Sequence, residues 1–410
     1  MTSRVYVLGG YQTDFAENWA RNGDELYDGF AHTVKTGVET VGIEPEQIDT
    51  AHVGNFAAEL FCKQGHLGGF FAAQHPSFSG KPASRHEAAC ASGSIALLTA
   101  AAEIEAGRYG VAAVIGIEQM RNVPGQTAAD YIGGPAMFSG HECTDVEFPW
   151  PHLFSELAEE YDKRFGIKQE HLAAIAKINF GNARRNPNAQ TRRWTFTDES
   201  FTEDDEANPV IEGRIRKQDC GQLTDGAAIV FLASAERAAD YVKKHGGKLE
   251  DLPYIKGWGH RTAPITYAQK IEESKDSPYV FPHVRGTIQD AFARAGIDSV
   301  DDLDGIETHD CFTSTEYMAI DHFGITEPGE SWKAVEAGDI ELGGRIPINA
   351  SGGLIGLGHP VGATGVRMML DSYKQVTGSA GDYQIEGAEN VATLNIGGSA
   401  TTTVSFVVGR

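Results

Sequence analysis

A stretch near the N-terminus recurs about 255 residues later, and this duplication limits the folds open to the chain. Residues 41–56 contain an amphipathic helix end, a Gly-Ile stop, an acidic turn and a strand, and residues 295–312 repeat that order. Both halves later carry a small-residue loop, a helix and an apolar strand, at 91–117 and 358–395. The matching segments are short, and similar helix–turn–strand sequence patterns recur by chance in α/β proteins. A true duplication predicts two halves related by a pseudo-twofold axis, with their corresponding loops brought together.

Apolar strands alternate with helical patterns along the whole chain. The predicted strand Val111–Ile117 follows the predicted helix Ile95–Ala106, and the strand Ala227–Leu232 precedes the helix Ala235–His245. A chain of 410 residues also exceeds what one hydrophobic core usually supports. We therefore predict an α/β protein made of two similar βαβαβ halves packed face to face.

A segment of different character separates the halves, with early glycine and proline and helices near Phe154–Phe165 and Gln169–Arg185. It is typical of an insertion folded over the core, as active-site lids often are. The predicted divisions are an N-terminal half at 1–120, the insertion at 121–216, a return to the first half at 217–265 and a C-terminal half at 266–410.

The net charge of −23 argues against nucleic acid as a partner, because phosphate binding needs a basic face. Five scattered cysteines without CxxC spacing favour neither a disulfide framework nor a thiolate zinc site, so a reducing compartment is expected. No apolar run approaches membrane-spanning length, which excludes membrane insertion. Because residues 4–10 already have the pattern of a strand, no signal peptide is expected, and the predicted location is cytoplasmic.

Cys90 is the first candidate for chemistry, because it lies just ahead of the predicted helix from Ile95 among small residues. A helix start offers unpaired N–H groups and a positive dipole end, which favour a thiolate over a thiol. Small neighbours leave room for a substrate. A free cysteine is more often inert and buried, so Cys90 alone leaves both interpretations open.

The glycine-rich run 349–365 carries one imidazole, that of His359, which we expect on a loop ahead of a helix from Val366. Its spacing matches neither GxGxxG nor GxxxxGK[ST], so a phosphate-binding loop is not predicted. A single histidine is usually structural. Held between glycine and proline, this one is better explained as a positioned base, because imidazole titrates near neutral pH and can take a thiol proton.

Two further runs lie at the ends of predicted strands. In the first, His309 and Cys311 flank an aspartate, and the companion ligands of a zinc enzyme are absent from the sequence, which favours an acid/base pair over a metal site. In the second, residues 393–399 end in glycines whose amides can point at a ligand oxygen. A plain strand-to-strand turn explains this second run equally well.

Four motifs in this order and at these separations, EAACASGS, HDCF, GLGHPVGATG and NIGGS, resemble those of the thiolase family from the first strand to the last residues. Most thiolases carry a second catalytic cysteine in a terminal Cys-x-Gly-Gly loop, where this chain has Asn395. The cysteine of HDCF stands where many thiolases have Asn-Glu-Ala-Phe. This exchange of cysteine positions, together with Asp219-Cys220 and residues 186–190, resembles the sterol-carrier type of thiolase. We expect the thiolase part alone, without the sterol-carrier domain.

The resemblance implies a layered α/β/α/β/α sandwich with an inserted loop domain, and a role for each motif. Cys90 would take the acyl group from coenzyme A, while His359 would activate it and help hold a thioester oxygen. Cys311 would be the acid/base thiol, and His309 would help bind the enolate oxygen. Backbone amides of Cys90 and Gly397 would bind the acyl-enzyme oxygen. Covalent capture divides carbon–carbon chemistry into two steps, each with its own oxyanion site.

Coenzyme A would be a co-substrate, with no permanent cofactor and no metal. Its phosphates need a positive patch, which an arginine group in the insertion offers, although a solvated surface run explains that group as well. The expected CoA contacts are Arg184, Arg185, Arg192, Arg193, Cys220 and Gly221. The stretch Phe148–Phe154 either lines an acyl pocket or only anchors the insertion.

The sequence therefore predicts an acyltransferase of the acetyl-CoA C-acyltransferase type, which cleaves 3-oxoacyl-CoA with CoA or condenses acyl-CoAs through a Cys90 acyl-enzyme. Lipid metabolism through fatty acid β-oxidation is the expected setting, and a homodimer or dimer of dimers the expected assembly. A second hypothesis is a thiolase-fold lyase, a retro-aldolase working on a CoA-linked side chain with a small partner, against which Cys311 argues. A third is a non-catalytic CoA-ester binding protein, in view of Asn395.

Overall fold

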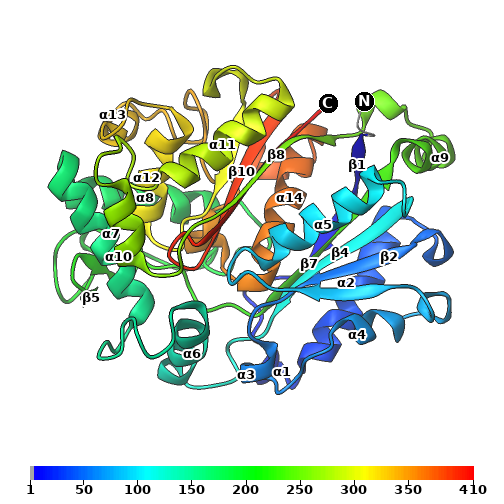
Figure 1. The fold of residues 1–410 in the computed structure, drawn as a ribbon, viewed down its shortest axis with the longest axis horizontal. Helices are drawn as coiled ribbons and strands as arrows, with labels where there is room; N and C mark the ends of the chain where they lie inside the picture. Colours follow the sequence, from blue (N-terminus) through cyan, green and yellow to red (C-terminus); the bar gives the residue numbers. More distant parts are fainter. Residues whose placement is uncertain (1–3) are drawn as a thin grey trace.

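In a computed structural model that describes residues 4–410, nine strands form one mixed sheet made of two parts (Figure 1). In sheet order, the first part contains β3 (Ala83–His86), β2 (Thr50–Gly54), β4 (Val111–Glu118), β7 (Gly226–Ser234) and β1 (Val5–Gln12). The second part contains β8 (Tyr254–Thr262), β11 (Thr402–Gly409), β10 (Asn390–Gly397) and β9 (Gly305–Thr308). Strands β1 and β8 pair only at Tyr6 and Tyr254, so the two parts diverge from a narrow junction.

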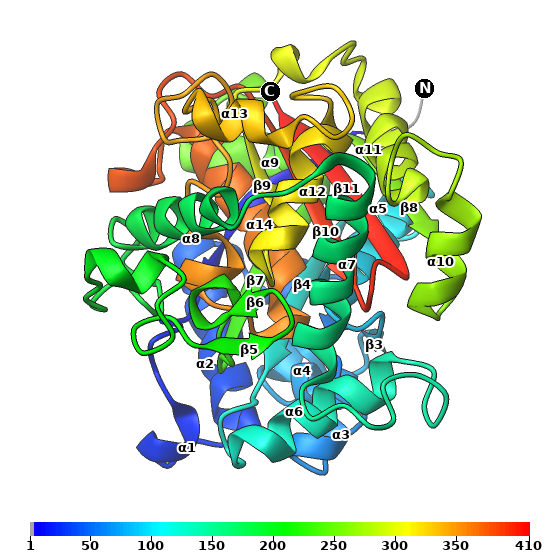
Figure 2. The ribbon, with the colours of Figure 1, turned by 90° about the vertical axis from the view of Figure 1, so that its left-hand side faces the viewer.

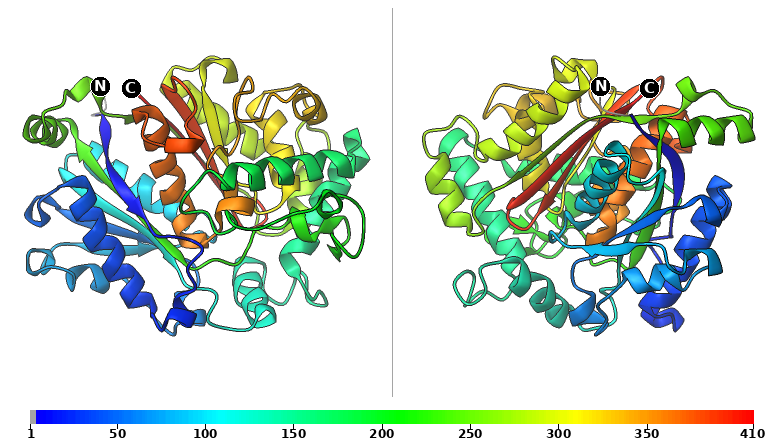
Figure 3. Two further views of the ribbon diagram at one scale, coloured as in Figure 1. Left: turned by 180° about the vertical axis from the view of Figure 1, so that it is seen from behind. Right: turned by 45° about the vertical axis from the view of Figure 1, so that its right-hand side comes forward.

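Helices on both faces of the two parts produce five layers. On the outer faces, α2 (Leu26–Val41) packs on β1 and β7, and α11 (Pro282–Ala295) packs on β8 and β11. Between the two parts, α5 (Ser92–Glu105) lies against α14 (Val361–Thr377), which contacts β4 and β7 on one side and β10 on the other (Figure 3). The predicted layered α/β/α/β/α sandwich is confirmed.

The central helix α14 begins at Val361, five residues before the predicted start at Val366. Its early glycines allow close packing rather than forming a loop. A Cβ on Gly362 would lie 2.7 Å from backbone atoms of β2 and β4, and one on Gly365 would lie 2.5 Å from the backbone nitrogen of Ser94. Only glycine permits α14 to approach the sheet and α5 this closely.

The two copies of the repeated sequence have the same structure. Helix α2 stops at Gly42 and α11 stops at Gly296, both in the left-handed conformation with φ of 70° and 71°. A short 3-10 turn then leads into a buried strand with parallel neighbours, β2 in the first half and β9 in the second. The duplication is therefore structural, and it places the chain after β2 and after β9 in corresponding positions.

The segment 121–216 contains α6 (Gly125–Gly133), α7 (Pro149–Phe165), α8 (Gln169–Ala183) and a small sheet of β5 (Val210–Glu212) and β6 (Ile215–Arg216). Helices α7 and α8 pack on α12 (Thr313–Phe323) and share its apolar core (Figure 2). The remaining helices are α1 (Trp19–Asn22), α3 (Ala58–Phe61), α4 (Gly68–Ala72), α9 (Ala235–His245), α10 (Tyr267–Ser274) and α13 (Ser331–Glu336). Within residues 4–410, none of the helices combines the length and the apolar character needed to cross a membrane.

Candidate active site

A cavity of about 290 Å³ lies where the inserted segment meets both halves, and the four side chains expected to take part in catalysis line it. They are Cys90, His309, Cys311 and His359. Most other walls are apolar, with contributions from Phe56, Met120, Ile132, Phe148, Trp150, Phe154 and Phe312. The structure thus gathers the two thiols and two imidazoles expected to be catalytic in a largely apolar chamber, which Cys220 also lines.

Three segment ends produce this convergence. Cys90 lies two residues before α5, His359 lies just before α14, and His309 with Cys311 follows β9 directly. Because α5 and α14 pack side by side and β9 pairs with β10, the three ends meet at one place. The ligand atoms of Cys90, His309 and His359 all lie within 4.8 Å of one another.

The glycine at the cavity is Gly398, one residue after the Gly397 that the sequence indicated. Gly397 is the last residue of β10 and packs tightly on the backbone of Ala88, whereas Gly398 lines the cavity. The backbone N–H groups of Gly398 and of Cys90 itself act on the Cys90 sulfur and lower the pKa of its thiol. A strand end cannot be fixed to one residue from sequence, and this explains the difference.

The charge state of Cys90 differs from the sequence expectation. Burial raises the pKa of its thiol to about 12, although the N–H groups of Gly398 and Cys90 lower it. Helix α5 begins at Ser92, so Cys90 precedes the helix rather than forming its first turn. Desolvation therefore outweighs the helix end, and the free protein holds a neutral thiol.

Both imidazoles at the cavity are neutral. Burial lowers the pKa of His359 to about 3 and that of His309 well below its usual value, and the positive charge of Arg367 acts in the same direction. Nδ1 of His359 lies 2.7 Å from Oγ1 of Thr364, while its Nε2 is buried and has no hydrogen-bond partner within residues 4–410. The two rings meet edge to face, with centroids 5.2 Å apart.

Cys311 is the second thiol with an expected catalytic role at the cavity. Burial raises its pKa well above the usual range, and the nearby Cys90 adds to this effect. Its backbone oxygen accepts a hydrogen bond of 2.7 Å from the N–H of Gly221. The predicted CoA contacts Cys220 and Gly221 therefore do lie at this cavity.

Asn395 reaches the same place from β10. Its Nδ2 lies 3.1 Å from the backbone oxygen of Cys90 and 3.2 Å from Nδ1 of His309. Its Oδ1 accepts a hydrogen bond of 2.8 Å from Oγ of Ser94. The residue that departs from the majority thiolase pattern thus contacts both the Cys90 segment and His309.

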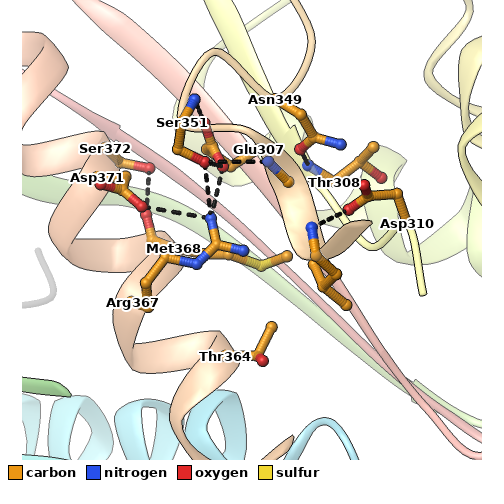
Figure 4. Close-up of polar contacts among 12 residues, drawn as sticks. Glu307, Thr308, Asp310, Asn349, Ser351, Thr364, Arg367, Met368, Asp371 and Ser372 are labelled. Atoms are coloured by element: carbon orange, nitrogen blue, oxygen red, sulfur yellow. Dashed lines mark hydrogen bonds and ion pairs between the residues drawn. The ribbon is translucent and has the colours of Figure 1, made fainter. Parts of the chain in front are cut away.

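Buried carboxylates hold the segment after β9 against the glycine-rich run (Figure 4). Asp310 accepts hydrogen bonds from the backbone N–H groups of Leu354 at 2.6 Å and Ile355 at 3.2 Å. Glu307 accepts from Oγ of Ser351 and from Nη1 of Arg367, each at 2.6 Å. The supporting role of these residues was not predicted from the sequence, although an arginine within the otherwise apolar turn Val366–Leu370 was a usable signal.

Glu118, at the end of β4, is a second support that the sequence analysis missed. Its buried carboxylate accepts hydrogen bonds of 3.0 Å from the N–H groups of Phe56 and Ala57 and of 3.1 Å from that of Gly362. Burial raises the pKa of Glu118 to about 7. It connects a wall of the cavity, Phe56, to the start of α14, immediately after His359.

The predicted arginine group lies away from the cavity. Arg184, Arg185, Arg192 and Arg193 line a separate hollow together with Lys374, and the two sites share no lining residue. Lys374 follows Val361, which does line the cavity, by 13 residues of the same helix. At about 1.5 Å per residue along a helix, Lys374 and Val361 are roughly 20 Å apart. The hollow that these arginines line therefore lies well away from the cavity, and their contact with the phosphates of CoA stays a prediction.

Two other sequence expectations concern the role of the stretch 148–154 and metal binding at the cavity. Five residues of the stretch 148–154 line the cavity, so this stretch is a wall as well as an anchor. Cys90, His309 and His359 are close enough to ligate a cation such as Zn²⁺. One nitrogen of His309 already faces the Asn395 amide, which leaves one imidazole nitrogen on each ring for the cavity.

The chain is similar to known proteins over almost its whole length. A family model described as thiolase, N-terminal domain, matches residues 5–236, and one described as thiolase C-terminal domain-like matches residues 266–410. The acetyl-CoA acetyltransferase of Methanothermobacter thermautotrophicus is 32% identical over 407 residues, which cover 99% of both chains. Sterol carrier protein 2 of Homo sapiens is 27% identical, with 99% of this chain and 72% of that protein covered.

A solved structure described as the Ltp2-ChsH2(DUF35) aldolase has a similar fold. It superposes with a TM-score of 0.78 over 99% of this chain and 98% of that chain, at 19% sequence identity. At this identity, the likeness concerns the fold alone.

Proposed function

The chain belongs to the thiolase family, and from that premise we propose that Cys90 carries the acyl group in a reversible acyl transfer to coenzyme A. The protein would cleave a 3-oxoacyl-CoA with CoA, or condense two acyl-CoAs in the reverse direction. Coenzyme A acts as a co-substrate. The observation that carries the proposal is the convergence of Cys90, His309, Cys311 and His359 in one apolar cavity.

In the first step, Nε2 of His359 takes the proton of the Cys90 thiol, and the sulfur attacks the 3-oxo carbon of the substrate. The bond between C2 and C3 then breaks, and its electron pair passes to an acetyl-CoA enolate. Cys311 gives its thiol proton to C2, which completes acetyl-CoA. The neutral Cys90 thiol and the His359 Nε2, which has no hydrogen-bond partner in the described part of the chain, suit this transfer.

In the second step, the thiol of CoA attacks the Cys90 thioester and gives its proton to the Cys311 thiolate. Cys90 leaves as a thiolate and recovers its proton from His359, so the protein returns to its starting state. The N–H groups of Cys90 and Gly398 face the oxygen of the acyl-enzyme, and His309 with protonated His359 binds the enolate oxygen. Gly398 here replaces the expected Gly397.

The apolar walls and the retained Cys311 favour thiolysis over the lyase hypothesis, since a retro-aldolase needs no second thiol. The same walls suit the acyl chain of a β-oxidation intermediate. A reducing, cytoplasmic location is supported by five cysteines that are all free. Assembly as a homodimer is supported by β3, which lies at an edge of the sheet and offers backbone groups to a second copy.

The test is capture of the acyl-enzyme. Incubation with a 3-oxoacyl-CoA should leave an acyl group on the peptide that contains Cys90, detected by mass spectrometry. Cys90→Ala should abolish both the adduct and thiolysis, while Cys143→Ala, a half-buried cysteine away from the cavity, should preserve both. Full thiolysis by Cys90→Ala would overturn the proposal.

A further inference from the structure

The side chain of Asn395 lies completely buried between the Cys90 segment and His309. One amide nitrogen serves two acceptors there, the backbone oxygen of Cys90 at 3.1 Å and Nδ1 of His309 at 3.2 Å. The amide oxygen faces the Ser94 hydroxyl on the other side. All polar groups of this side chain are therefore used.

The orientation of the amide is fixed by chemistry. A backbone carbonyl can only accept a hydrogen bond, so the Asn395 atom that faces the Cys90 oxygen has to be the nitrogen. A flipped amide would place two oxygens against each other and turn the NH₂ group toward Ser94. The second hydrogen of the same nitrogen then points at Nδ1 of His309.

This contact decides which nitrogen of His309 carries the proton. An Nδ1 that receives a hydrogen bond needs its lone pair there, so the single proton of the neutral ring is on Nε2. We propose that Asn395 is a positioning residue that holds His309 in the Nε2–H tautomer and so makes it a hydrogen-bond donor toward the cavity. The consequence for catalysis rests on the proposed function, in which that donor binds the enolate oxygen.

The neighbouring imidazole is held in the opposite tautomer. The Thr364 hydroxyl lies 3.3 Å from the backbone oxygen of Pro360, to which it donates, and therefore accepts from Nδ1–H of His359. Nε2 of His359 is then left as a lone pair that has no partner among residues 4–410. Two similar rings in one cavity thus differ in role, with His359 as base and His309 as donor, because different side chains hold their Nδ1 atoms.

The direct test is the tautomer itself, measured by ¹⁵N NMR of the full-length protein labelled at histidine, with His309→Asn used to assign the signals. The wild type should show a protonated Nε2 and an unprotonated Nδ1 for His309. Asn395→Asp should move the proton to Nδ1, because a carboxylate only accepts, and Asn395→Ala should leave a mixture of tautomers. Ser94→Ala is the matched control, since it removes a bond to the same side chain but leaves Nδ2 in place.

Kinetic measurements on the same variants separate the acylation of Cys90 from the carbon–carbon bond cleavage. In Asn395→Ala, exchange of labelled CoA into an acyl-CoA, which needs only Cys90 acylation, should stay within a few-fold of wild type. Thiolysis, which needs the enolate donor, should fall by about 10². Ser94→Ala should keep both activities.

Two results would overturn the inference: a wild-type His309 with its proton on Nδ1, or an Asn395→Ala protein that keeps the pure Nε2–H tautomer with unchanged thiolysis. Failure of the proposed function has a different signature. Wild-type protein would then show no exchange of labelled CoA, while the NMR result for Asn395 would stand on its own.

Discussion

The guanidinium of Arg367 lies 2.6 Å from the Glu307 carboxylate, and both side chains are excluded from solvent. Asp371 lies 3.3 Å from the same Arg367 nitrogen, so one positive charge serves two buried carboxylates. This group joins α14 to β9, the two elements that present His359 and His309 to the cavity. Its stability therefore bears directly on the geometry of the site.

Arg367→Met should reduce the free energy of unfolding by about 3–5 kcal/mol, because it leaves buried carboxylates without their counter-charge. Adding Glu307→Gln should recover part of this loss. The measurement is chemical denaturation of each variant. As a control, Lys244→Met removes an exposed ion pair with Glu44 and should cost at most about 1 kcal/mol. An equal loss for the buried and exposed pairs would contradict this account.

The pH dependence of Cys90 alkylation reports its charge state. Because burial raises the pKa of this thiol to about 12, the thiolate fraction is small at neutral pH and grows as the pH rises. Carbamidomethylation of Cys90 by iodoacetamide should therefore accelerate about tenfold per pH unit from about pH 7 to pH 10. Peptide mass spectrometry measures this rate. A plateau below about pH 8 would instead indicate a thiolate–imidazolium pair.

Glu316, on α12, should make the protein less stable as the pH rises. Burial, reinforced by the charge of Asp310, raises the pKa of Glu316 above its usual range, whereas an unfolded glutamate ionises near about pH 4.3. Between these values the folded state binds more protons than the unfolded state, so stability falls with increasing pH.

Glu316→Gln should flatten this dependence. Its amide oxygen can still accept the hydrogen bonds from Asn179 and Asn349, now without a charge to ionise. Thermal unfolding across about pH 5 to pH 8 measures the slope, and the exposed Glu250→Gln provides the control. Identical slopes in wild type and Glu316→Gln would show that another group is responsible.

The length of the acyl chain accepted should depend on α6. Ala129 lines the cavity, so Ala129→Phe should occupy part of its 290 Å³ and reduce kcat/KM for long 3-oxoacyl-CoAs by about tenfold or more. The shortest substrate, acetoacetyl-CoA, should be affected much less. Asp130→Phe, an exposed position on the same helix, is the control. A uniform loss for all chain lengths would place the acyl chain elsewhere.

Much of the fold was accessible from sequence because its signals are local. The strand Val111–Ile117 and the helix Ala235–His245 were predicted almost to the residue, since apolar runs and helix stops mark them. The start of α14 was missed because its glycines resemble a loop until the helix packed against them is known. The CoA contacts expected for Arg184 and its neighbours stay a prediction: their charge was visible in the sequence, whereas only the structure places them in a hollow separate from the cavity.

The sequence by itself determined the duplicated α/β halves, the family and the four candidate side chains that line the cavity, because residue type and spacing carry that information. Only the tertiary structure decided the protonation states of these side chains. Burial keeps Cys90 a thiol and both imidazoles neutral, while the contacts of Asn395 and Thr364 decide which nitrogen of each ring holds the proton. Desolvation and hydrogen-bond direction arise from groups that are distant in sequence, and therefore they exist only in the folded chain.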